Sequence, residues 1–141
     1  MTTELQVHAV HEGGMRFTAS AGGHAVTLDY PFRPDEVGAG PTPLQMLLMS
    51  LAACSGSTVA LVLERMKQPF AGLEVDARAT RSDEHPTVLT EIALIFTIRG
   101  VEVQAETVQK ALAIAETQLC PVWAMLKAGT PIAASYRLVN D

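Results

Sequence analysis

The chain has 141 residues and a mass of 15.0 kDa, which is the usual size of a single domain, here residues 1–141. Apolar residues make up 48% and charged residues 18%, a composition too hydrophobic for a disordered chain. Ten basic residues against fifteen acidic ones give a net charge of −5. Without a basic run, this balance argues against a nucleic-acid partner and against attachment to an anionic membrane surface.

The first third of the sequence predicts three short strands. They cover residues 5–10, 16–21 and 24–30, and the glycine pairs Gly13-Gly14 and Gly22-Gly23 between them are typical of hairpin turns. The first thirty residues contain no basic segment followed by an apolar block, which would mark a secretory signal. Two cysteines are too few for a disulfide scaffold. We therefore expect a cytoplasmic protein.

A long apolar helix follows a loop rich in proline and glycine. Thr42 as N-cap and Pro43 as the first helical residue predict its start, and it is expected to end at about Met66. The uncharged stretch 41–63 is long enough to cross a bilayer. Its polar residues, and the lack of a cationic cluster at either end, favour the central helix of a soluble fold instead. No membrane partner is expected.

The second half alternates between strands and helices. Strands are predicted over 73–80 and 88–99, a helix over 102–119 that Pro121 interrupts, a short helix to about Ala128 and a last strand over 132–139. The resulting order, β-β-β-α-β-β-α-α-β, predicts an α+β fold. Because so short a chain has difficulty covering such an apolar helix, we expect a homodimer that shares the N-terminal strands or the central helices.

The two cysteines have the most distinctive settings among the reactive side chains. Cys54 lies inside the apolar helix, where a free cysteine often acts only as a small buried hydrophobe. Cys120 precedes Pro121 and becomes the N-cap of the next helix if Pro121 is its first residue. That position favours a thiolate, so Cys120 can be a reactive thiol. The alternative is that Cys120 is only a small residue at a kink. Cys54 and Cys120 are too far apart in sequence for a CxxC or zinc motif.

Other kinds of site find little support. The four histidines, His8, His11, His24 and His85, form no His-x-x-His or Glu-x-x-His pair, so no metal site is expected. No phosphate-binding glycine loop or serine nucleophile elbow is present, so no cofactor is expected.

Two segments resemble the OsmC/Ohr family, the osmotically inducible and organic hydroperoxide resistance proteins. One is Gly40-Pro41-Thr42-Pro43-Leu44-Gln45-Met46-Leu47-Leu48 followed by Leu51-Ala52-Ala53-Cys54, and the other is Leu119-Cys120-Pro121-Val122. The likeness is to the small OsmC-like branch of that family. It implies an OsmC-like α+β fold in an intertwined homodimer, with the helices packed against sheets.

The resemblance also implies a thiol peroxidase active in oxidative-stress defence. Cys54 is then the thiolate that attacks an organic hydroperoxide and becomes a sulfenic acid, and Cys120 condenses with it to a disulfide. An external dithiol reductant restores the two thiols. The alternative is a non-catalytic protein that binds a hydrophobic small molecule in the dimer cavity.

The family's activating arginine and its carboxylate partner are less easily matched. The arginine comes from the strands or loop before the central helix, and Arg33 is the first candidate and Arg16 the second. The carboxylate near the helix start has no counterpart, since Leu44 and Gln45 stand there. Gln45 can hydrogen-bond an arginine but cannot neutralise it, and this departure favours the binding protein.

Overall fold

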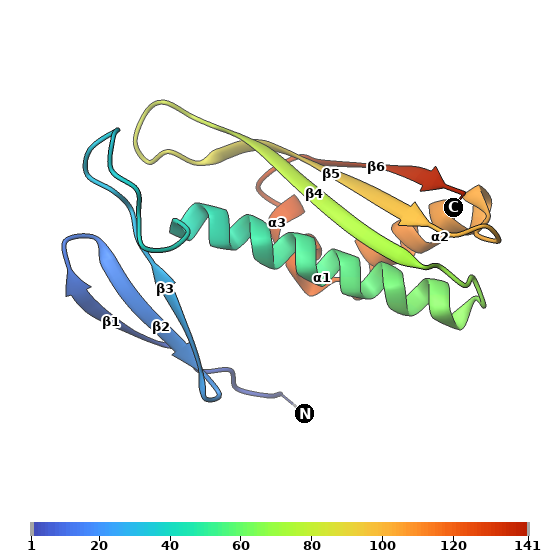
Figure 1. Cartoon of the computed structure of the whole chain (residues 1–141), viewed down its shortest axis with the longest axis horizontal. Coiled ribbons are helices and arrows are strands. Elements are labelled where there is room, and N and C mark those ends of the chain that lie inside the picture. Colours follow the sequence, from blue (N-terminus) through green and yellow to red (C-terminus); the bar gives the residue numbers. More distant parts are fainter. Residues whose placement is uncertain (1, 141) are drawn as a thin grey trace. The chain divides into compact units, whose positions relative to one another are not determined.

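The structure is a computed structural model that describes residues 2–140. It contains two compact units, the residues up to Leu47 and those from Leu48 onward, and each is described here by itself. Figure 1 shows the elements of both. That the whole chain is one domain stays a prediction.

The N-terminal unit is a three-stranded antiparallel sheet in the order β1-β2-β3. Its strands are β1 (His8–Gly13), β2 (Arg16–Ala21) and β3 (His24–Leu28). The turn between β2 and β3 has φ values of +54° at Gly22 and +85° at Gly23, which glycine adopts without strain. The predicted first strand was wrong at its start, because β1 begins at His8 and not at residue 5. His8 pairs with Ser20, one residue before the end of β2, so residues 5–7 lack a partner strand.

None of the described residues up to Leu47 is buried. Several large apolar side chains in this unit are exposed instead: Leu5, Val7, Val10, Met15, Phe17, Val26, Tyr30, Phe32 and Val37. This three-stranded sheet therefore does not bury its hydrophobic residues within its own unit.

The loop before α1 (Pro43–Arg65) is tied to the end of β3. The backbone N–H of Asp29 donates to the Pro41 carbonyl at 3.0 Å, and the Ala39 N–H donates to the Asp29 carboxylate at 2.9 Å. Gly40 lies so close to β3 that a β-carbon there would stand 2.0 Å from the Thr27 carbonyl oxygen. The loop therefore requires glycine at this position for reasons of space.

Gly40→Ala is expected to destabilise the N-terminal unit by about 3 kcal/mol, the upper range for overpacking, since the obstacle is backbone. Chemical denaturation measures the change. Gly129→Ala is the control, because nothing lies within 4 Å of a β-carbon at Gly129 and its φ is not positive. Equal stability of Gly40→Ala and the parent would contradict the close approach.

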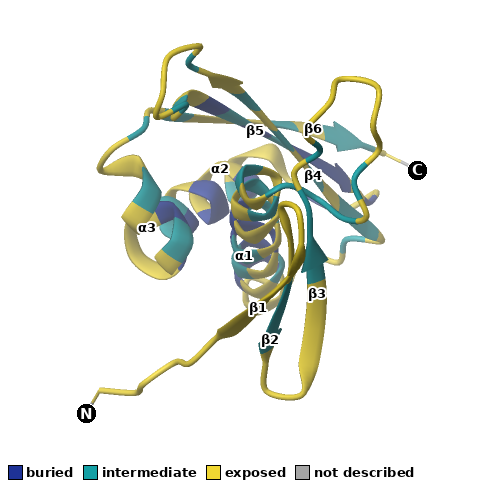
Figure 2. Cartoon of the chain, turned by 90° about the vertical axis from the view of Figure 1, so that its left-hand side faces the viewer, coloured by how far each residue is buried: buried dark blue, intermediate teal, exposed yellow. Residues whose placement is uncertain are grey.

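The C-terminal unit is a sheet with helices on one face, as Figures 1 and 2 show. Its strands run in the order β4-β5-β6, with β4 and β5 antiparallel and β5 and β6 parallel. The strands are β4 (Gly72–Arg81), β5 (Leu89–Arg99) and β6 (Ile132–Val139), and the helices beside α1 are α2 (Ala105–Ile114) and α3 (Pro121–Lys127). Together with the three strands of the N-terminal unit, these elements confirm the predicted α+β class and the predicted order β-β-β-α-β-β-α-α-β.

The core lies between the sheet and the helices. Alternate residues of β5 point into it, and Leu94, Phe96 and Ile98 are fully buried. From α1 a stripe of residues joins them: Leu51, Ser55, Gly56, Val59, Val62 and Leu63. Gly56 permits a close approach to β4, since a β-carbon there would stand 3.0 Å from a Val75 methyl.

Among the described residues, α1 alone is long and apolar enough to cross a bilayer by length and composition. That criterion is weak, because core helices of soluble proteins meet it as well. Six residues of α1 are buried in the core, and 39% of its most apolar window is buried.

The second half of the helix predicted over 102–119 is not α-helical in the structure. The chain is α-helical from Ala105 to Ile114, and Ala115–Leu119 forms a π-helical turn in which the Cys120 N–H donates to the Ala115 carbonyl at 2.9 Å. The wider turn leaves Leu119 exposed and brings Cys120, five residues after the buried Ala115, into the core. Turns of this kind are frequent at functional sites.

Candidate active site

Cys54 lies on α1 at the border of its buried stripe. Its side chain is half-buried and packs against the core, and both cysteines are free thiols. The hydroxyl groups that surround it in the sequence are satisfied by the helix itself. Ser55, Ser57 and Thr58 donate to carbonyl groups three or four residues earlier, so the helix around Cys54 stays apolar despite its composition.

Cys120 is the N-cap of α3, with Pro121 as the first helical residue, as predicted. Its φ of −82° and ψ of 107° are those of an extended residue that precedes a helix. The side chain is 1% exposed and belongs to the core cluster. The π-helical turn on one side and the proline on the other thus fix a cysteine in the protein interior.

The thiols of Cys54 and Cys120 interact directly. Burial raises the pKa of Cys120 above its ordinary value of 9.0, and the backbone N–H of Trp123 opposes that rise. A hydrogen bond with the Cys54 side chain and the charge of Cys54 raise the pKa of Cys120 further. Burial therefore opposes the thiolate that the N-cap position favours, because loss of hydration outweighs the stabilising N–H groups. Cys54 is thus a neighbour of Cys120 whose side chain affects its ionisation, and both are free thiols.

A raised pKa of Cys120 makes any attack by its thiolate dependent on pH. Below its pKa the thiolate fraction grows about tenfold per pH unit, so the rate constant of Cys54–Cys120 disulfide formation is expected to rise with that slope from pH 7 through 9.0. Stopped-flow measurement after a pulse of oxidant tests the slope. A plateau below pH 8 would contradict a raised pKa.

The two arginine candidates belong to the N-terminal unit and differ in their surroundings. Arg33, the first choice, has a side chain 79% exposed and lies 3.8 Å from Glu36. Arg16 lies 3.5 Å from the carboxylate of Asp29, whose side chain is only 13% exposed, and lines a hollow of about 280 Å³ with Asp29, Tyr30 and Phe32. Arg16 is thus the better anchored of the two, and a role for either toward Cys54 stays a prediction.

Gln45 takes part in the start of α1. Its side-chain Oε1 accepts the Thr42 N–H at 2.9 Å, while the Thr42 hydroxyl accepts the Gln45 N–H at 3.1 Å. This reciprocal pair is a capping box, and the spacing Thr-x-x-Gln was its signal in the sequence. The structure gives Gln45 a capping function, and its contact with an arginine stays a prediction.

Trp123, the single tryptophan of the chain, was not predicted as a site residue. It follows Cys120 by three residues, and its backbone N–H lies beside the Cys120 sulfur. Trp123 is 1% exposed and stacks on Phe96 of β5 with ring centroids 6.5 Å apart. The same spacing in the sequence was the available signal.

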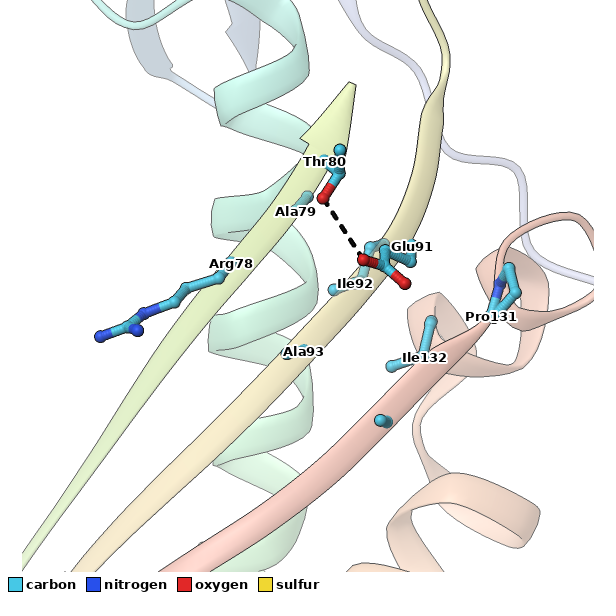
Figure 3. Close-up of a pocket in the computed structure, with 9 residues that line it drawn as sticks. Arg78, Ala79, Thr80, Glu91, Ile92, Ala93, Pro131 and Ile132 are labelled. Atoms are coloured by element: carbon cyan, nitrogen blue, oxygen red, sulfur yellow. Dashed lines mark hydrogen bonds between the residues drawn. The ribbon is translucent and has the colours of Figure 1, made fainter. Parts of the chain in front are cut away.

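A hollow of about 410 Å³ lies elsewhere on the C-terminal unit, over β4, β5 and the start of β6 (Figure 3). Thr80 and Glu91 hydrogen-bond across it at 3.5 Å, and neither cysteine lines it. Between residues 2 and 140 no three His, Cys, Asp or Glu side chains are grouped as a metal site.

The chain has an α+β fold, with a half-buried Cys54 and a buried Cys120 as neighbours at its core. A model of the family described as OsmC-like protein matches residues 35–135. The chain therefore belongs to the OsmC-like family, and the resemblance found in the sequence is confirmed.

Individual proteins agree with this assignment. Protein YhfA of Escherichia coli K12 is 29% identical over 120 residues, which are 85% of this chain and 87% of YhfA. A hypothetical protein from Aquifex aeolicus VF5 aligns over 99% of both chains, with a TM-score of 0.89 and 21% identity. An OsmC-like protein from Mycoplasma pneumoniae also aligns over 99% of both chains, with a TM-score of 0.86 and 24% identity. The organic hydroperoxide resistance protein OhrB of Bacillus subtilis aligns over 96% of this chain and 98% of its own, with a TM-score of 0.70 and 15% identity. At these identities the solved structures establish the fold.

Proposed function

We propose that the protein is a thiol-dependent peroxidase that reduces organic hydroperoxides in oxidative-stress defence. The contact between the half-buried Cys54 thiol and the buried Cys120 thiol carries the proposal. Membership of the OsmC-like family, and the likeness in fold to a protein of organic hydroperoxide resistance, support it.

The roles of the two cysteines follow from their exposure. Cys54, the more accessible, attacks a peroxide oxygen; the O–O bond breaks, and with one proton the products are Cys54 sulfenic acid and an alcohol. Cys120 then attacks the sulfenic sulfur and expels water, which leaves the Cys54–Cys120 disulfide. An external dithiol reduces that disulfide and is itself oxidised. The apolar surroundings favour fatty or aryl hydroperoxides over hydrogen peroxide.

An arginine from the N-terminal unit completes the proposed chemistry. A guanidinium near Cys54 stabilises its thiolate and the alkoxide that leaves. Arg33 and Arg16 are both retained for this role. The anchoring of Arg16 by Asp29 supports the second of them.

A homodimer in the cytoplasm is part of the same proposal. The exposed apolar residues of the N-terminal sheet support it, and so do Leu47, Met49, Leu61 and Met66, which α1 and the residue after it leave exposed. A second copy of the chain is the partner that would cover such surfaces.

Intact-mass analysis of the reduced protein tests the peroxidase. One equivalent of cumene hydroperoxide is expected to remove two hydrogens per chain, the mass change of a disulfide. An unchanged mass, with both thiols still titratable, would overturn the proposal.

The alternative is a protein that binds a hydrophobic small molecule without turnover. The first turn of α1 contains no acidic residue, so a carboxylate partner for the arginine is missing there. An apolar compound that copurifies with the protein, seen by native mass spectrometry together with unreactive thiols, would favour this alternative.

A further inference from the structure

Trp123 contains a buried donor without an acceptor. Its indole Nε1 has no hydrogen-bond partner among the described residues, and it is the only buried side-chain nitrogen or oxygen in that part of the chain of which this holds. Leaving such a group unpaired costs about 1–3 kcal/mol. Native proteins rarely retain that cost, and a buried donor of this kind calls for an explanation such as a bound water or ion, or a part in the chemistry of a site.

The position of Trp123 connects this donor with the dithiol. Its backbone N–H stabilises the Cys120 thiolate, so Trp123 and the Cys120 sulfur are close neighbours. Cys54 also affects the ionisation of Cys120, and all three side chains belong to, or pack against, one apolar cluster. The stack on Phe96 fixes the ring between α3 and β5. The unpaired N–H is therefore a rigid donor in the surroundings of the two thiols.

We propose that Trp123 binds the ligand of this site, with its indole N–H donating to the carbon-bound oxygen of an organic hydroperoxide and of the alcohol formed from it. This assignment rests on the proposed function for the identity of the ligand. One neutral donor among apolar side chains favours a hydrocarbon that bears one oxygen function, and a hydrocarbon without oxygen leaves the donor unpaired.

The single tryptophan makes the donor directly observable. In ¹⁵N-labelled, reduced protein the indole gives one N–H cross-peak in the NMR spectrum. Titration with 2-phenyl-2-propanol, the alcohol formed from cumene hydroperoxide, is expected to move the proton of this peak downfield. Cumene, which has the same hydrocarbon frame without oxygen, is expected to leave it in place. An unmoved peak with the alcohol, or equal shifts with both compounds, overturns the proposal.

A variant series gives a second readout. Trp123→Phe keeps an aromatic ring beside Phe96 and removes the donor, so the Kd for 2-phenyl-2-propanol is expected to rise about 3- to 10-fold, the worth of one neutral hydrogen bond. Tyr136→Phe is the matched control, since it removes a polar atom that pairs with Gln109 instead and is expected to leave Kd unchanged. Equal Kd values for Trp123→Phe and the parent contradict the inference.

The two proposals fail separately. A disulfide that forms with hydroperoxide while the indole peak stays unmoved rejects the role of Trp123 alone. An indole peak that responds to the alcohol in a protein whose thiols remain reduced rejects the peroxidase, and it supports a binding site for oxygen-bearing hydrocarbons.

Discussion

Cys54→Ser is expected to reduce hydroperoxide turnover to the rate of the uncatalysed reaction. A serine hydroxyl in the same position is not ionised near neutral pH and is a far weaker nucleophile than a thiolate. The substitution is also nearly isosteric at a half-buried position, so the free energy of unfolding is expected to change little. The loss therefore reports on chemistry and not on folding.

The measurement is steady-state consumption of cumene hydroperoxide with excess dithiol, together with intact-mass analysis of the oxidised protein. Ser57→Ala is the control, because Ser57 is an exposed residue of the same helix whose hydroxyl only bonds the Ala53 carbonyl. Parent-like turnover is expected for that variant. Equal turnover in Cys54→Ser and the parent would remove Cys54 from the mechanism.

Much of the fold was predictable because local signals agreed with one another. Thr42 and Pro43 specified the start of α1, and the glycine pair Gly22-Gly23 specified a turn whose positive φ values the structure contains. The start of β1 was not predictable in this way. Alternation at residues 5–7 fits a strand, but the pairing of that stretch depends on where β2 ends.

The candidate site was predictable in its residues more than in its energetics. Cys120 at the N-cap of α3 followed from the proline after it. Its raised pKa did not, because it results from burial of Cys120 in the core cluster, whose members come from distant parts of the sequence. From the sequence, Pro121 predicted only that the helix is interrupted before it. The π-helical turn over Ala115–Leu119 was not predictable, since no residue type specifies such a turn.

Two residues illustrate signals that were present in the sequence but needed the structure to be interpreted. The spacing of Thr42 and Gln45 is that of a capping box, and the structure shows both of its hydrogen bonds. Trp123 stands three residues after Cys120, and only its burial without an acceptor separates it from an ordinary core residue. A donor left unpaired is a property of the packed interior, which a sequence pattern does not encode.

Cys120→Ser is expected to separate the two steps of the cycle. The first step, oxidation of Cys54, needs only the Cys54 thiolate and is expected to keep its rate. The second step loses its nucleophile, so Cys54 accumulates as a sulfenic acid. Steady-state turnover is expected to fall on the order of 100-fold, because an external thiol must replace one that contacts Cys54 within the protein. Serine is itself a favoured N-cap, so α3 is expected to remain folded.

A mass increase of one oxygen after a single equivalent of hydroperoxide, and capture of the product by dimedone, would identify the sulfenic acid. Excess oxidant is expected to carry this variant on to sulfinic acid, whereas the disulfide protects the parent from that step. Parent-like turnover in Cys120→Ser would mean that the external reductant acts on the sulfenic acid directly. Cys120 would then be a core residue that happens to contact the reactive thiol, and the π-helical turn that buries it would have no part in the chemistry.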